Sequence, residues 1–109
     1  MKEERPAEPQ AAGPRDGSAL ESAARVEAMR AIVAAHLRGD RRARADVERL
    51  AVELAAVARR EGDAPERLLI AIRKLWRDLG LPQADRLQAA SLYELLVRRA
   101  IEEYYGDQS

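Results

Sequence analysis

Residues 63–82, DAPERLLIAIRKLWRDLGLP, contain both ends and the apolar face of one helix. Asp63 and Glu66 form a D-x-x-E start, and Pro65 lies in the first turn, where its missing N–H removes no hydrogen bond. Gly80, followed by an apolar residue and a proline, is typical of a Schellman-type end. The sequence therefore predicts a helix with one apolar face, formed by Leu68, Leu69, Ile72, Leu75, Trp76 and Leu79.

Two further helices are predicted before this stretch. The first begins at an S-x-x-E capping box formed by Ser18 and Glu21, carries an apolar stripe and ends at Gly39. The second is capped by Asp40 and ends at Gly62. Its apolar seam alternates steps of three and four residues and comprises Val47, Leu50, Leu54 and Val57.

A last helix is predicted over about residues 83–105, with a stop at Gly106. Ser91 and Glu94 form another S-x-x-E pattern, so a break near Ala90 is an alternative. The apolar side chains of this helix cover about half of its circumference, which predicts packing against more than one neighbour. They are Leu92, Tyr93, Leu96, Val97, Ala100, Ile101 and Tyr104.

The predicted fold is all-α, because the chain has no alternating β-branched run and no Asn-Gly turn. We expect a small four-helix bundle, or three helices with a docked C-terminal helix, over residues 18–106. Residues 1–17 contain prolines and glycines among charges without an apolar period, and we expect a disordered tail there. Residues 107–109 form a short second tail in this scheme.

Composition limits the function. The 109 residues include 19 Lys and Arg and 19 Asp and Glu, so no net charge attracts the protein to nucleic acid or to an anionic membrane. The absence of cysteine excludes disulfides, thiolate nucleophiles and thiolate metal sites. No secretory signal or membrane-spanning run is present, which favours the cytoplasm, and abundant Arg and Ala without Asn favour a bacterial source.

His36 is the only imidazole of the chain. Asp40, four residues later, could orient the ring, and Ser22 or Ser91 could complete a triad. No strained turn or glycine-lined oxyanion loop marks either serine as a nucleophile, so we expect His36 to have a structural or capping role. No metal-ligand spacing or phosphate loop is present, and we expect no cofactor, no metal and no enzymatic activity.

Partner binding is best indicated by the helix over residues 63–82. Its face opposite the tryptophan places one isoleucine among cations, a pattern suited to anchoring an acidic amphipathic helix. Leu95 is expected to lie in a similar way on the outer side of the last helix. We therefore expect a non-enzymatic interaction module that binds a protein partner or forms a homodimer, unless a further helix covers these residues: Arg67, Ile70, Arg73, Lys74, Arg77 and Leu95.

Nucleic-acid binding is the alternative function. The most basic stretch lies at the corner between the first two helices, where four arginines could contact phosphates. Asp40, Asp46 and the absence of interleaved aromatic residues argue against this alternative. Its candidate residues are Arg38, Arg41, Arg42 and Arg44.

Overall fold

The computed structural model describes residue 20 and residues 22–106. Within them the chain forms helices without a strand, which confirms the all-α prediction. The expected tails and the predicted capping box of Ser18 and Glu21 lie outside the described residues. The helices are α2 (Ala23–Leu37), α3 (Arg42–Glu61), α4 (Pro65–Asp78), α5 (Gln83–Gln88) and α6 (Ala90–Tyr104).

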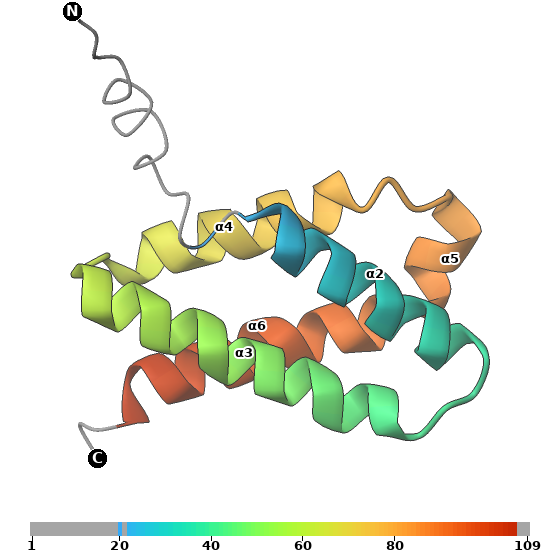
Figure 1. The fold of residues 1–109 in the computed structure, drawn as a ribbon, viewed down its shortest axis with the longest axis horizontal. Coiled ribbons are helices and arrows are strands. Elements are labelled where there is room, and N and C mark those ends of the chain that lie inside the picture. Colours follow the sequence, from blue (N-terminus) through green and yellow to red (C-terminus); the bar gives the residue numbers. More distant parts are fainter. Residues whose placement is uncertain (1–19, 21, 107–109) are drawn as a thin grey trace, which may run out of the picture.

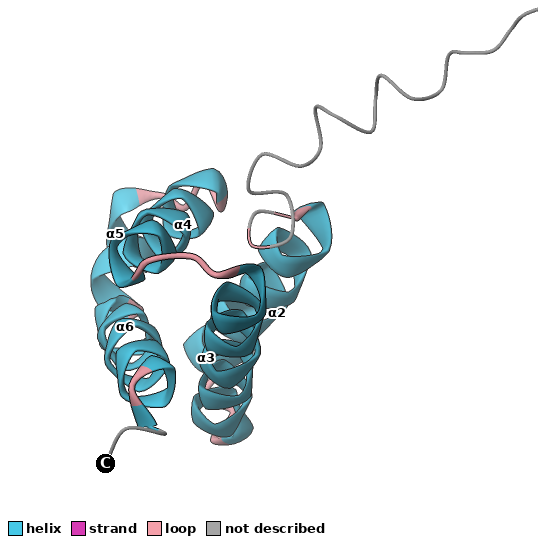
Figure 2. Ribbon diagram, turned by 90° about the vertical axis from the view of Figure 1, so that its left-hand side faces the viewer, coloured by secondary structure: helices cyan, strands magenta, loops and turns pink. Residues whose placement is uncertain are grey.

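The four longer helices pack into one bundle. Viewed nearly end-on, α4 and α6 lie on one side and α2 and α3 on the other (Figure 2). The largest interface joins α6 to α3, and α6 also contacts α4 and α5, so the prediction that the last helix has several neighbours is confirmed. The short α5 lies at the end of the bundle that also holds the α2–α3 turn (Figure 1).

The core is built from the apolar seams of all four longer helices, and no polar or charged residue is buried within the described part of the chain. Each fully buried Leu, Ile or Val side chain contributes on the order of 1.5–3 kcal/mol. Trp76, predicted as a core residue, is only half-buried, and its ring packs beside Tyr93 with 5.1 Å between centroids. The fully buried side chains include Met29, Val33, Val47, Leu54, Leu68, Ile72 and Leu96.

The predicted glycine stops of the first three helices are confirmed. Gly39, Gly62 and Gly80 have φ values of 86°, 74° and 65°. A side chain would clash with the backbone in this left-handed conformation, so glycine lets the chain reverse after each helix. The last helix also stops before its predicted glycine, since α6 ends at Tyr104 with Tyr105 as its C-cap, but Gly106 has no positive φ.

The helix starts follow the predicted signals only in part. The side chain of Ser22 accepts the Arg25 N–H at 3.2 Å, so it is Ser22 that caps α2. The Asp40 carboxylate accepts the Arg42 N–H at 2.9 Å and thus satisfies one donor at the start of α3, as predicted.

The predicted D-x-x-E start of α4 is wrong, although Pro65 is its first residue as expected. Ala64 is the N-cap and no side chain caps the helix, whereas the backbone carbonyl of Asp63 accepts the Tyr104 hydroxyl. The alternative of a break in the last helix is confirmed, at Ala89, but Ser91 does not cap α6. The helix breaks there without the predicted capping box.

Candidate functional site

Ile70 is exposed on α4, as predicted, with 53% of its surface accessible. The cations predicted around it differ in their environment. Lys74 forms an ion pair with Asp78, with 3.3 Å between Nζ and Oδ2, so its charge is compensated. Arg67, Arg73 and Arg77 form no ion pair with any residue that the structure describes.

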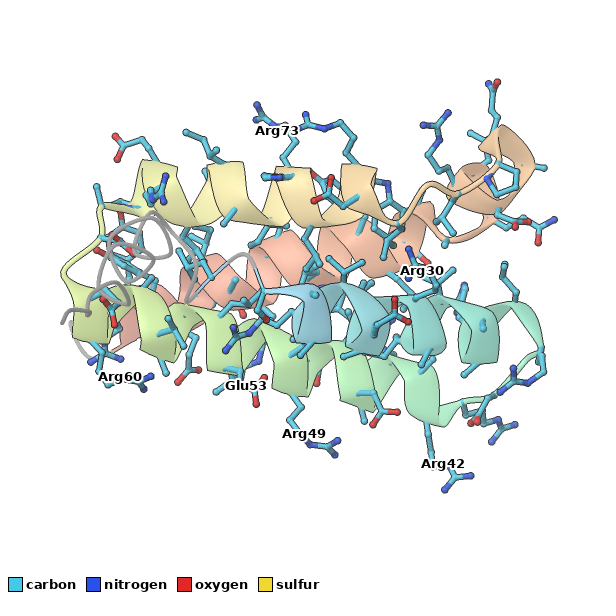
Figure 3. The ribbon with its side chains drawn as sticks, turned by 45° about the horizontal axis from the view of Figure 1, so that its top comes forward. Arg30, Arg42, Arg49, Glu53, Arg60 and Arg73 are labelled. Atoms are coloured by element: carbon cyan, nitrogen blue, oxygen red, sulfur yellow. The ribbon has the colours of Figure 1, made fainter. Side chains whose placement is uncertain are left out.

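A groove between α4 and α6 lies beside Ile70. It has a volume of about 380 Å³ and combines half-buried apolar side chains with two arginines and one glutamate. Arg73 belongs to this groove and also follows Ile70 by three positions on α4, and its side chain projects away from the bundle (Figure 3). The residues of the α4–α6 groove are Leu69, Arg73, Tyr93, Glu94, Val97 and Arg98.

Leu95 does not lie on this surface. Its side chain is only 4% exposed and belongs to the core, so the prediction that it is an outer anchor is wrong. The reason is that α6 packs against α3, α4 and α5 together, which covers a wider arc of the helix than one apolar stripe indicates. Tyr93 and Val97, which the sequence pattern assigned to the apolar face, supply the α6 side of the groove instead.

The four arginines of the predicted nucleic-acid site are all exposed, and two of them line one pocket. Arg42 pairs with Asp40, with 3.7 Å between Nε and Oδ1, and its side chain points away from the bundle (Figure 3). Arg41 and Arg44 line a pocket under the corner, and Arg38 is exposed outside this pocket. Two of the four arginines therefore line the pocket at this corner.

This corner pocket has a volume of about 440 Å³. It lies between the α2–α3 corner and the start of α6. The α2–α3 corner supplies the lining residues that fall within 36–44, whereas α6 supplies residues 91 and 92. The His36 ring lies against the α5–α6 junction, with 3.3 Å between Nε2 and the Gln88 carbonyl oxygen. The corner pocket is lined by His36, Gly39, Asp40, Arg41, Arg44, Ser91 and Leu92.

The three residues considered for a triad, His36, Asp40 and Ser91, line this one pocket, but the described residues show no hydrogen bond among them. The imidazole Nε2 faces the Gln88 carbonyl, and the Asp40 carboxylate binds the start of α3. The other candidate, Ser22, caps the opposite end of α2. The geometry of a nucleophile activated by a base is absent from these residues.

Arg30 has a structural role that the sequence did not indicate. It pairs with Glu27 on α2 and donates to the carbonyl oxygens of Asp78 and Leu79 at 3.4 and 3.3 Å. Those carbonyls lie at the end of α4, where helix acceptors lack intrahelical partners. Arg30 therefore ties α2 to the end of α4 (Figure 3).

Within residues 20 and 22–106, no group of three or more His, Asp or Glu side chains is arranged to hold a metal ion. In the same part of the chain, none of the helices has the length and apolar character needed to cross a lipid bilayer.

Comparison with known proteins gives no match: no family model, no curated protein and no solved structure is significantly similar to this chain. The α4–α6 groove and the corner pocket are therefore the two candidate functional surfaces. The α4–α6 groove with Ile70 combines apolar area with uncompensated positive charge, and the corner pocket combines two arginines with a histidine and a serine.

Proposed function

We propose that this protein is a non-enzymatic interaction module that binds an acidic amphipathic helix of a partner protein along the α4–α6 groove. The observation that carries this proposal is the exposed Ile70 directly beside the groove. Its proposed setting is the bacterial cytoplasm, which the composition of the chain favours.

Apolar contact would supply the affinity. Covering an exposed isoleucine removes apolar surface from water and contributes on the order of 1.5–3 kcal/mol. Leu69, Tyr93 and Val97 are half-buried and add apolar surface along the groove. Two neighbouring helices with such a groove suit the helix-in-groove mode, in which side chains at i, i+3, i+4 and i+7 of the partner enter the groove.

Charge would select an acidic partner. Arg73 and Arg98 both line the groove, where Glu94 is the one carboxylate residue among its described lining. Arg67 and Arg77 on α4 add two more positive charges that no described carboxylate compensates. Glutamates flanking the apolar stripe of a partner helix would meet these arginines, raise the association rate and disfavour basic partners.

The groove is lined by residues of α4 and α6, and α2 and α3 lie on the other side of the bundle (Figure 2). A partner helix could therefore lie along α4 and α6 without displacing any described helix. The half-buried Trp76 packs on Tyr93, which lines the groove. The fluorescence of this single tryptophan therefore provides a probe of binding.

The test is a titration with two designed helical peptides that share one leucine stripe, flanked by glutamates in one and by lysines in the other. We expect the acidic peptide to change the Trp76 fluorescence saturably. Its affinity should fall in high salt, because salt screens the attraction between the opposite charges. Ile70→Glu combined with Arg73→Glu should weaken this binding about tenfold or more, because it removes the anchor and reverses a charge. The melting temperature should not fall, since both side chains are exposed.

Arg49→Glu is the matched control, because Arg49 lies on the outer face of α3 (Figure 3). It also reverses one exposed positive charge but should leave peptide binding unchanged. Equal binding of the acidic and basic peptides, or unchanged binding by the double variant, would contradict the proposal. The remaining hypothesis is that a second copy of the chain covers this groove. Light scattering on the free protein tests it by measuring whether the protein is a monomer or a dimer.

A further inference from the structure

The corner pocket brings two uncompensated positive charges to one place. Arg41 and Arg44 are three residues apart at the start of α3, and both line the pocket. Neither forms an ion pair with any residue in the described part of the chain. An anion between the two arginines would therefore be attracted by both positive charges.

The one carboxylate residue of the pocket lining does not neutralise these two arginines. Asp40 accepts the backbone N–H of Arg42 at 2.9 Å and lies 3.7 Å from its guanidinium Nε. Its charge is therefore directed to the start of α3 and to Arg42, which points away from the bundle (Figure 3). An excess of positive charge remains within the pocket.

The other wall supplies polar groups and fixed geometry. Ser91 lies in the first turn of α6, and its hydroxyl can donate a hydrogen bond. His36 is held at 3.3 Å from the Gln88 carbonyl oxygen, which joins the end of α2 to the α5–α6 junction. The pocket thus combines the two arginines with polar groups from the end of α2 and the start of α6.

We propose that the corner pocket binds the phosphate group of a small phosphate monoester, with Arg41 and Arg44 on its oxygens and Ser91 donating a hydrogen bond. Guanidinium groups match phosphate oxygens in a planar, two-pronged geometry that lysine cannot reproduce. The volume of about 440 Å³ lies in the range of small-molecule sites and leaves space for an organic group beyond the phosphate.

The same features favour a small phosphate over nucleic acid. Nucleic-acid affinity rises with the number of phosphates that Lys and Arg neutralise along the backbone. Here only two of the four corner arginines converge, while Arg42 is paired and Arg38 lies outside the pocket. Among the residues lining the pocket there is also no Phe, Tyr or Trp side chain on which a base could stack.

The test is an NMR titration of the isotope-labelled protein with phenyl phosphate, inorganic phosphate and a single-stranded oligonucleotide. We expect the amide signals of Gly39, Arg41, Arg44 and Ser91 to shift saturably at millimolar phenyl phosphate. Arg41→Ala combined with Arg44→Ala should raise the Kd about tenfold or more. Substituting both arginines with lysine keeps the charge but loses the two-pronged geometry, and should give an intermediate Kd.

Arg42→Ala is the matched control, since it removes an adjacent positive charge from the same corner but outside the pocket. It should change the Kd less than about twofold, as expected for a screened exposed charge. The proposal is overturned by the absence of saturable shifts, or by equal losses from Arg42→Ala and the double variant. Tighter, steeply salt-dependent binding of the oligonucleotide would overturn it in favour of a nucleic-acid site.

Discussion

Ile70 and Leu95 are aliphatic residues that helical spacing places near charged residues, yet their environments are opposite. Ile70 is 53% exposed and Leu95 is 4% exposed. Leu95→Ala should therefore lower the free energy of unfolding by about 2–4 kcal/mol, because it removes apolar contacts and leaves a cavity. Ile70→Ala should change it by less than about 0.5 kcal/mol.

Urea denaturation followed by circular dichroism measures both free energies of unfolding. If the free energy falls with urea concentration at the same slope in both variants, the two variants unfold to similar states. A small loss for Leu95→Ala would mean that α6 does not pack as described. A large loss for Ile70→Ala would place this residue in the fold rather than on a binding surface.

At the scale of elements, the end of α6 is joined to the α3–α4 turn by one side-chain hydrogen bond. The Tyr104 hydroxyl donates to the Asp63 carbonyl at 2.6 Å. Tyr104→Phe should therefore lower the free energy of unfolding by about 1 kcal/mol, since a partly buried acceptor loses its donor. In a domain of this size that change lowers the melting temperature by roughly 4–8 °C.

Tyr105→Phe provides the matched control for this contact. Tyr105 is exposed and its ring packs edge-on against Tyr104, but its hydroxyl has no hydrogen-bond partner among the described residues. The melting temperature of the Tyr105→Phe variant should therefore stay close to that of the unchanged protein. An equal decrease in both variants would show that the hydroxyl contact with Asp63 is not the cause.

At the scale of the whole molecule, the two candidate surfaces use different parts of the bundle. The α4–α6 groove and the corner pocket share no lining residue. Substitutions at sites without shared partners act almost independently. We therefore expect Ile70→Glu with Arg73→Glu to leave phenyl phosphate binding unchanged, and Arg41→Ala with Arg44→Ala to leave binding of the acidic peptide unchanged.

Both titrations, carried out on both double variants, check this independence. If each variant weakened both ligands, the two sites would be coupled or one of the variants would be misfolded. Circular dichroism spectra of the two variants distinguish these cases.

The sequence by itself determined the helical fold and most of the helix ends. The apolar spacing indicated the buried seams. Gly39, Gly62 and Gly80 marked where the chain reverses, because the left-handed backbone there depends on the residue itself and not on distant contacts. The exposure of Ile70 was also correctly predicted. The capping of α4 was predicted wrongly, since Asp63 matched a capping pattern without serving as the cap.

Only the tertiary structure decided which surfaces remain open. Periodicity identifies the apolar face of one helix but not how many neighbours cover it, so Leu95 was assigned to the surface although α6 packs against α3, α4 and α5. The corner pocket likewise depends on contacts between α2 or α3 and α6, which bring Arg41 and Ser91 together from distant parts of the chain. Local residue patterns set each helix, whereas the packing of helices against one another determines the sites.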